Sequence, residues 1–167
     1  NWVFGWRAGI NFNQSPAQPF LSEIHDIGND STPSTFPQAV SDCNGKLLYY
    51  IGGDTLVWNK QNNLLNTMGE MKFGNFNNLF IPAPCSDSQV YLFIVRSDID
   101  SPGLDYFLLN NNMDSGRGDF EKYRIHITDS FGKGMGFIKH KNDTDYWLLF
   151  KTSIYTMHAY LLTKKGI

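Results

Sequence analysis

The sequence is poor in cysteine. Cys43 and Cys85 are the only two among 167 residues, which excludes a disulfide-rich scaffold and a four-cysteine zinc site. Each stands in a polar turn just before an apolar run, so the two occupy equivalent positions of successive repeats. Equivalent turns of neighbouring repeats usually lie farther apart than the roughly 7 Å between Cα atoms that a disulfide allows. We therefore expect two free thiols.

The sequence also lacks an excess of positive charge and any long apolar run. Lys and Arg number 14 against 16 Asp and Glu, a net charge of -2, so no basic surface favours nucleic acid as a partner. Apolar runs such as 90–95 are far shorter than the roughly 18 residues of a membrane-spanning helix. No basic and apolar leader precedes Asn1, which we interpret as a signal peptide already removed or never present.

The sequence does contain patterns that are typical of β-strands and tight turns. Short apolar and aromatic runs alternate with clusters of Gly, Asn, Asp, Ser and Pro, and almost no stretch has helical spacing. The clearest hairpin covers 36–51, where Asn44 and Gly45 supply residues that tolerate positive φ. This pattern predicts an all-β protein.

The same four-strand pattern recurs along the chain. An opening hairpin at 1–13 is followed by repeats at about 36–65, 79–127 and 136–167. The predicted strands of the repeats are 36–40, 46–51, 55–59 and 63–65; then 79–83, 89–95, 104–109 and 123–127; then 136–140, 145–150 and 155–162. Repeats of roughly 40 to 55 residues with four short strands are typical of propeller blades. We predict about three four-stranded antiparallel blades of an incomplete β-propeller ring, a single region that is part of a longer chain. A β-sandwich is the alternative.

Several of these stretches resemble one protein family. Residues 2–12 (WVFGWRAGINF), 41–50 (SDCNGKLLYY) and 57–59 (VWN) are similar to the opening of large surface proteins of gliding Bacteroidota. Residues 80–84, and then 138–140 with 145–147, match later segments of that family in the same order. The resemblance implies an exported, propeller-like amino-terminal region at the bacterial cell surface, after signal-peptide removal. It also implies sorting by the type IX secretion system and an association with gliding motility, and it supplies no catalytic residues.

Acidic residues offer the only metal pattern. Asp98, Asp100 and Asp105 alternate in a way that can turn carboxylates toward one calcium ion, although we favour a solvated acidic loop and expect no cofactor. The four histidines, at 25, 126, 140 and 158, have no metal-ligand spacing, and the sequence has no nucleophile, phosphate-loop or dinucleotide motif. We therefore expect no enzyme.

Loops define the expected binding face. If each repeat runs from inner to outer strand, the second-to-third loops and the links between repeats emerge on one side, where function tends to reside. We predict a ligand contact there through Arg96, Asp98, Asp100 and Lys133.

The expected partners follow from an open array of blades. A protein or a surface glycan is the expected ligand, and the remaining blades of this chain, or another chain, are expected to cover the open edge. The function predicted is a non-catalytic exported module for binding, adhesion or assembly. The alternative is an extracellular carbohydrate-active enzyme or its carbohydrate-binding accessory domain.

Overall fold

Strands dominate the structure. The computed structural model describes residues 1–3, 7–23, 38–52, 56–65, 73–96, 103–129, 134–153 and 155–167, with only the backbone for 73–77. The strands are β1 (Trp2–Val3), β2 (Ala8–Asn11), β3 (Gln18–Leu21), β4 (Gln38–Ser41), β5 (Leu47–Gly52), β6 (Leu56–Asn59), β7 (Phe73–Pro82), β8 (Gln89–Arg96), β9 (Gly103–Asn110), β10 (Asp119–Thr128), β11 (Met135–Lys139), β12 (Tyr146–Lys151) and β13 (Met157–Leu162). One helical turn, α1 (Met113–Gly116), joins β9 to β10.

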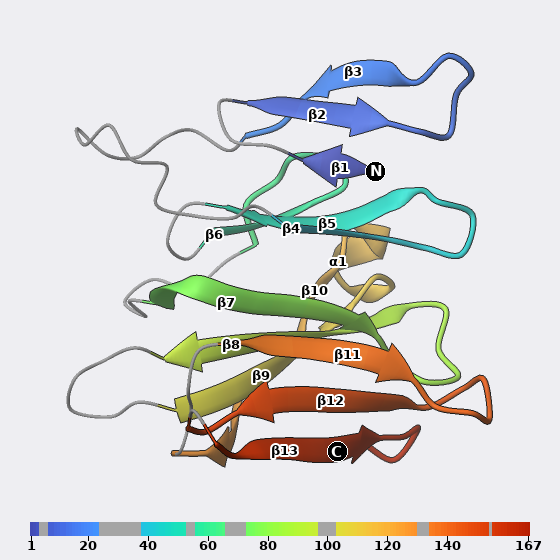
Figure 1. Ribbon diagram of the computed structural model, residues 1–167. Coiled ribbons are helices and arrows are strands. Elements are labelled where there is room, and N and C mark those ends of the chain that lie inside the picture. Colours follow the sequence, from blue (N-terminus) through green and yellow to red (C-terminus); the bar gives the residue numbers. More distant parts are fainter. Residues whose placement is uncertain are drawn as a thin grey trace.

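These strands form four antiparallel sheets, each a meander in chain order (Figure 1). Sheet A contains β1 to β3, sheet B β4 to β6, sheet C β7 to β10 and sheet D β11 to β13. The tight β4–β5 turn explains one sequence signal: Gly45 has a φ of 77°, as predicted, and donates its N–H to the carbonyl of Asp42. Asn44 is not in the positive-φ region, because a loop of this length needs the left-handed residue only at its end.

The four sheets stack face to face in chain order, with a separate apolar core in each gap. Between sheets A and B, Val3 and Phe20 pack with Tyr50 and Trp58. The cores of the next two gaps are larger, and their members alternate along the strands. Between B and C they include Tyr49, Ile51, Val57, Leu92 and Phe107. Between C and D they include Phe93, Leu108, Leu148, Phe150 and Leu162.

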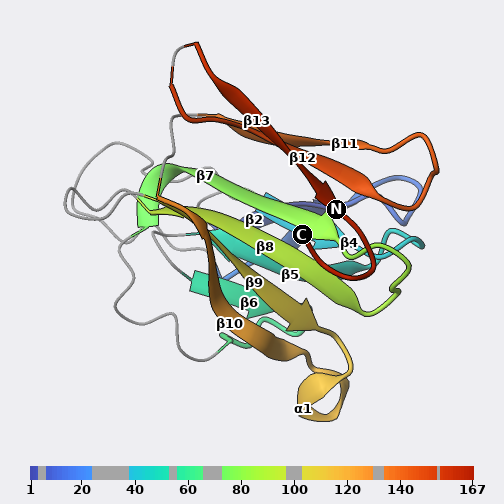
Figure 2. The same ribbon diagram turned by 90° about the horizontal axis from the view of Figure 1, so that it is seen from below.

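The first strands of consecutive sheets approach one another. Within the described residues, β1 contacts β4, β4 contacts β7, and β7 contacts β11, and these are the substantial backbone contacts between different sheets. Figure 2 shows β6 and β10, the last strands of sheets B and C, lying away from β4 and β7. The sheets therefore converge on their first strands.

Sheets B and C are covered on both faces. Residues 90–95 of β8 are all buried, as are 48–52 of β5. A strand buried on both faces reads as an unbroken apolar run instead of an alternating one, which accounts for the Val-Tyr-Leu-Phe-Ile-Val stretch of β8. In contrast, β10 is at the edge of sheet C and is largely exposed.

The all-β, antiparallel prediction is confirmed, but the strand count differs. The structure has four sheets where three four-stranded repeats were predicted, and within the described residues only sheet C has four strands. The opening segment is a three-stranded sheet, not a hairpin at 1–13, because β3 was missed. Pro16 precedes β3 and Pro19 lies within it. Proline is tolerated in β3 because this strand is at the edge of its sheet.

The predicted strand at 63–65 is wrong. Leu64 makes a single bridge to Trp58, and the preceding residues form a turn in which the Asn59 side chain accepts the N–H groups of Gln61 and Asn63. Both cysteines are free and exposed, as expected. Within the described part of the chain, no helix has the length and apolar character that crossing a membrane requires.

Phe93 tests the packing of sheet C on sheet D. Its ring is fully buried and lies 5.9 Å from the ring of Tyr91 and 6.0 Å from that of Tyr106. Phe93→Ala should lower the free energy of unfolding by about 3–5 kcal/mol, because it removes buried surface and leaves a cavity. Tyr155→Ala, at a side chain 92% exposed, should change it by less than about 0.5 kcal/mol. Urea unfolding measures both, and equal effects would contradict the described core.

Tyr49 links stability to alkaline pH. Its hydroxyl is buried without a hydrogen-bond partner among the described residues, and burial, then the charge of Asp119, raises the pKa of its phenol. The unfolded state loses this proton near pH ~10 while the folded state keeps it, so the free energy of unfolding falls as pH rises above ~10. Tyr49→Phe should leave stability at pH 7 unchanged or higher, since it removes an unsatisfied polar group.

The pH series separates this effect from general alkaline unfolding. In chemical denaturation from pH 7 to pH 11, Tyr49→Phe should show a shallower loss of stability above ~10 than the parent. Tyr155→Phe is the matched control at an exposed site, and it should follow the parent. A Tyr49→Phe profile identical to that of the parent would rule out this linkage.

Candidate functional site

A cluster of charged side chains lies where β8 ends and β9 begins. Arg96 is the last residue of β8 and pairs with Gly103, the first of β9. Ile94 lies directly opposite Asp105 and two residues before Arg96, and it belongs to the B–C core, so strand alternation places Arg96 and Asp105 on the face of sheet C that packs on sheet B. We name this set the sheet C ion cluster; its members are Arg96, Asp105, Arg124, His126 and Asp129.

Asp105 is the centre of the sheet C ion cluster. Its Oδ2 lies 2.9 Å from Nε of Arg96 and 3.1 Å from Nε of Arg124, and its Oδ1 lies 2.8 Å from Nδ1 of His126. The Asp105 and Arg96 side chains are buried, whereas those of Arg124 and His126 are about half exposed. Both carboxylate oxygens therefore have cationic or imidazole partners, as a buried charge requires.

Two backbone features make this cluster possible. Arg124 has a φ of 47°, and the β9–β10 register shifts on either side of it. A β-bulge re-aims side chains, and here it brings Arg124 onto the same carboxylate that His126 contacts. Gly103 leaves the room for Arg96: a Cβ at this position would lie 2.5 Å from Nη2 of Arg96 and 2.9 Å from the carbonyl oxygen of Thr128.

The imidazole of His126 lies between two carboxylates. The second ring nitrogen of His126, Nε2, lies 3.1 Å from Oδ1 of Asp129, so both nitrogens of the ring face carboxylates. A histidine that activates a nucleophile needs one nitrogen directed at that nucleophile. The ion pairs hold together the end of β8, the start of β9 and the second half of β10.

The predicted loop-face residues are only partly described. Arg96 lies in a buried ion pair, so the structure places its guanidinium on Asp105 and not on the surface. Asp98, Asp100 and Lys133 lie outside the described residues. The calcium hypothesis stays a prediction, and Asp105 would have to exchange its present partners for the metal. In the described part of the chain, no three His, Cys, Asp or Glu side chains gather as metal ligands.

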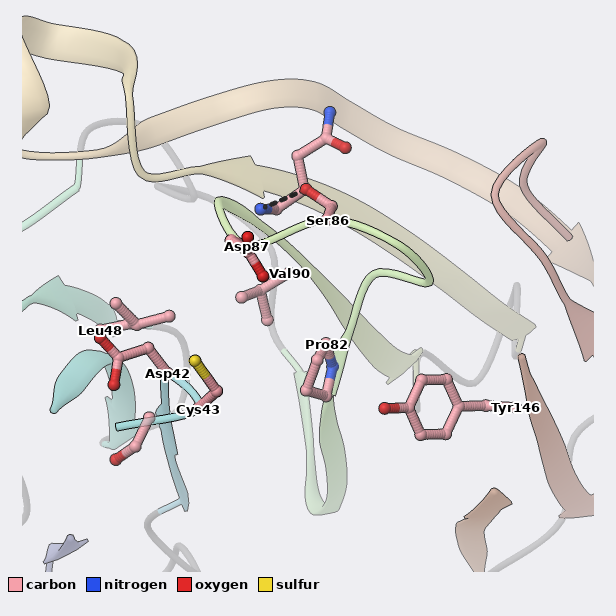
Figure 3. Close-up of a pocket in the computed structure, with 10 residues that line it drawn as sticks. Asp42, Cys43, Leu48, Pro82, Ser86, Asp87, Val90 and Tyr146 are labelled. Carbon is pink, nitrogen blue, oxygen red and sulfur yellow. Dashed lines mark hydrogen bonds between the residues drawn. The ribbon is translucent and has the colours of Figure 1, made fainter. Parts of the chain in front are cut away.

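A cavity of about 310 Å³ lies at the other end of the strands, where sheets B, C and D meet (Figure 3). Its walls come from the β4–β5 turn, the β7–β8 turn and the start of β12. The described residues that line it are Ser41, Asp42, Cys43, Leu48, Pro82, Ser86, Asp87, Gln89, Val90 and Tyr146. We name it the turn-end cavity.

Some polar groups of the turn-end cavity build its walls. Oδ1 of Asp42 accepts the N–H groups of Asn44 at 3.0 Å and Lys46 at 2.8 Å. The hydroxyl of Ser86 accepts the N–H groups of Ser88 and Gln89 in the same way in the next sheet. These are the local side-chain turns that Asp and Ser favour, and they make the rim rigid.

The other lining groups of the turn-end cavity supply a hydroxyl, a second carboxylate and apolar surface. Figure 3 shows the Tyr146 hydroxyl directed toward the cavity from sheet D, with Asp87 on the turn between β7 and β8. Leu48, Pro82 and Val90 supply apolar surface, and none of the described lining residues is basic. An apolar wall with a few polar groups is the usual composition of a ligand site, and its carboxylates favour hydroxyl or cationic groups.

Sequence reasoning missed the turn-end cavity and the partners of Asp105. One signal was present: Asp105 interrupts the otherwise apolar strand Leu104 to Leu109, and a carboxylate there requires a partner. The partners of Asp105 could not be predicted from the sequence, because His126 and Arg124 belong to a different strand. The cavity is built by turns of sheets B and C and by the start of β12, and no single stretch of sequence signals it.

Comparison with known proteins adds no constraint on either site. No protein-family model, curated protein or solved structure matches the chain. The assignment of a function therefore depends on the residues and their geometry.

Asp105 provides the test of the sheet C ion cluster. Asp105→Ala should lower the free energy of unfolding by about 3–5 kcal/mol, because it leaves the buried charge of Arg96 without its carboxylate. Asp129→Ala, at a side chain 83% exposed, should cost less than about 1 kcal/mol. Denaturant unfolding at neutral pH measures both.

A double variant separates lost charge pairing from lost packing. Arg96→Met combined with Asp105→Leu removes both buried charges, and this should recover most of the stability lost in Asp105→Ala. A double variant as unstable as Asp105→Ala would mean that shape at this position, and not the unpaired charge, determines the loss.

Proposed function

We propose that this chain is part of a β-propeller that serves as a non-catalytic binding module at a bacterial cell surface. The observation that carries the proposal is the line of first strands, in which β1, β4, β7 and β11 contact one another in chain order. Meander sheets that converge on their first strands have the arrangement of propeller blades around an axis. A sandwich of two sheets would bury only one face of each sheet, whereas sheets B and C are buried on both.

The turn-end cavity supports binding as the activity. It lies at the turn ends of β4 and β7, and three sheets contribute to it. The rim is held by side-chain turns at Asp42 and Ser86, so its shape is set before a ligand arrives. A preorganised site loses less conformational entropy on binding. The ligand that fits is a surface glycan or a protein segment, through hydroxyl or cationic groups.

The cellular setting rests on the resemblance. Similarity to surface proteins of gliding Bacteroidota supports export, a position at the cell surface, and a role in adhesion or assembly linked to type IX secretion or gliding motility. The loop side of the sheets remains a second candidate contact surface, with Asp98, Asp100 and Lys133 as its predicted residues.

A carbohydrate-active enzyme is the second candidate function. The observation that favours it is the presence of two carboxylates, Asp42 and Asp87, in one cavity, since most glycosidases use a pair of carboxylates. Against it, Oδ1 of Asp42 already accepts two backbone N–H groups, a structural task that a general acid or base does not usually carry.

Binding without turnover is the result that tests the proposal. The purified chain is incubated with a panel of bacterial exopolysaccharides, chitin, cellulose and pectin, and binding is followed by affinity electrophoresis while released reducing ends are assayed. We expect binding to a member of the panel with no release of product. Asp87→Asn should weaken that binding about tenfold or more, as the loss of a charge-assisted hydrogen bond does.

Controls assign the outcome to one surface. The triple variant Asp98→Ala, Asp100→Ala, Lys133→Ala should bind as the parent does. Loss of binding in the triple variant with none in Asp87→Asn would move the site to the loop side. Release of reducing ends that Asp87→Asn abolishes would support the enzyme, and a chain that binds no polysaccharide of the panel would refute a glycan ligand.

A further inference from the structure

A second cavity lies between sheets A and B, with a volume of about 390 Å³. Small-molecule sites typically enclose roughly 300–1,000 Å³. The cavity is formed where β2 ends, where β5 begins and where the chain leaves β6. Figure 1 shows the β2–β3 and β4–β5 turns on the same side of the stacked sheets. We name it the amide-lined cavity.

Carboxamides and lysines supply the polar groups of the amide-lined cavity. These side chains are Asn1, Asn11, Asn13, Gln61, Lys46 and Lys60. The described residues that line the cavity include no carboxylate. The turn-end cavity has the opposite character, because it is lined by Asp42 and Asp87 and, within the described residues, by no basic side chain. The two cavities therefore select ligands of opposite charge.

Several hydrogen-bond donors of the amide-lined cavity are not used by the protein itself. Among the described residues, the ammonium groups of Lys46 and Lys60 form no ion pair. In contrast, each of the four arginines pairs with a carboxylate. The side-chain N–H groups of Asn11 and Gln61 also have no hydrogen-bond partner in the described part of the chain. These four side chains therefore offer their donors to a ligand.

The walls of the amide-lined cavity are held in place by the protein. The carbonyl oxygen of Gly45 accepts a side-chain N–H of Asn13 at 2.6 Å, which ties the β4–β5 turn to the β2–β3 turn. Oδ1 of Asn11 accepts the backbone N–H of Asn13 at 2.9 Å. The ring of Phe20 packs with the A–B core and lies so close to Gly9 that a Cβ there would clash with it. A cavity fixed in this way loses little conformational entropy on binding.

We propose that the amide-lined cavity binds a carboxylate-bearing saccharide, a uronic acid unit of an acidic polysaccharide. The two lysine ammonium groups supply charge-assisted hydrogen bonds to the carboxylate. Carboxamides both donate and accept hydrogen bonds, as sugar hydroxyls do, so the remaining polar groups match the ring substituents. Phe20 and Leu47 also line the cavity and offer apolar surface to the C–H face of a sugar ring.

This inference goes beyond the proposed function, because it concerns a separate cavity and does not require that the turn-end cavity is occupied. The β4–β5 turn stands between the two cavities: Asp42 and Cys43 line the turn-end cavity, whereas Lys46 and Leu47 line the amide-lined cavity. An acidic peptide also offers carboxylates, but it lacks the dense hydroxyl groups that the carboxamides match. The saccharide is therefore the ligand that uses both the lysines and the carboxamides.

Calorimetric titration of the 167-residue chain with hexamers of galacturonate, mannuronate and guluronate tests the proposal. The parent should bind at least one of them, and more weakly as the salt concentration rises, because salt screens exposed charges. The double variant Lys46→Gln, Lys60→Gln should bind that hexamer about tenfold or more weakly. The matched control Lys141→Gln, Lys164→Gln removes the same net charge at two exposed lysines outside the cavity, and it should bind like the parent.

Two further ligands test the chemistry of recognition. The methyl ester of the galacturonate hexamer and a hexamer of glutamate should both bind more weakly than the uronates. An ester that binds as well as the acid would overturn the role of charge, and a glutamate hexamer that binds as tightly would overturn the saccharide. A parent that binds none of the three uronates would overturn the proposal as a whole.

Asp87→Asn separates this site from the turn-end cavity. This variant should bind uronates like the parent, because Asp87 does not line the amide-lined cavity. Loss of uronate binding in Asp87→Asn, with none in the double lysine variant, would overturn the inference and move the ligand to the turn-end cavity. Circular dichroism and thermal unfolding confirm that each variant is folded. Lys46→Gln alone, at an exposed side chain, replaces a double variant that is not, and it should weaken binding roughly threefold or more.

Discussion

Burial of sheets B and C on both faces is the constraint on which the rest of the structure depends. Each must present apolar side chains in both directions, so β5 and β8 are apolar at successive positions. This double burial ties neighbouring sheets into one stack and brings their first strands into contact.

The two polar sites follow from the same stacking. Between sheets B and C, the strand ends carry Asp105, whose carboxylate is buried and therefore needs Arg96, Arg124 and His126 around it. At the opposite ends of the strands, the turns of sheets B and C and the start of β12 cannot fill the space where three sheets meet, and the turn-end cavity results. The first site joins three strands of sheet C, and the second is the cavity to which we assign the proposed ligand.

The local pattern of apolar and turn residues was enough to predict the positions of most of the strands. The Asn44–Gly45 turn, the apolar run of β8 and the strands β9 and β12 all lie where the sequence predicted them. The errors fall where local pattern and tertiary context disagree. Pro19 reads as a loop residue but occupies an edge strand, and Leu64 reads as a strand residue but makes only one bridge. The first half of β10 reads as polar loop, yet it pairs with β9 through an irregular register.

The sequence by itself determined the all-β character, the antiparallel hairpins and the free thiols, because turn residues and apolar spacing act within a few positions of one another. Arg96 and Asp105 were both noticed in the sequence, but as separate solvent-facing groups. Only the tertiary structure decided that they form one buried pair, and that the turns of sheets B and C and the start of β12 enclose a cavity. The physical reason is that these features depend on which strands pack together across long separations in the chain, and no local pattern records that choice.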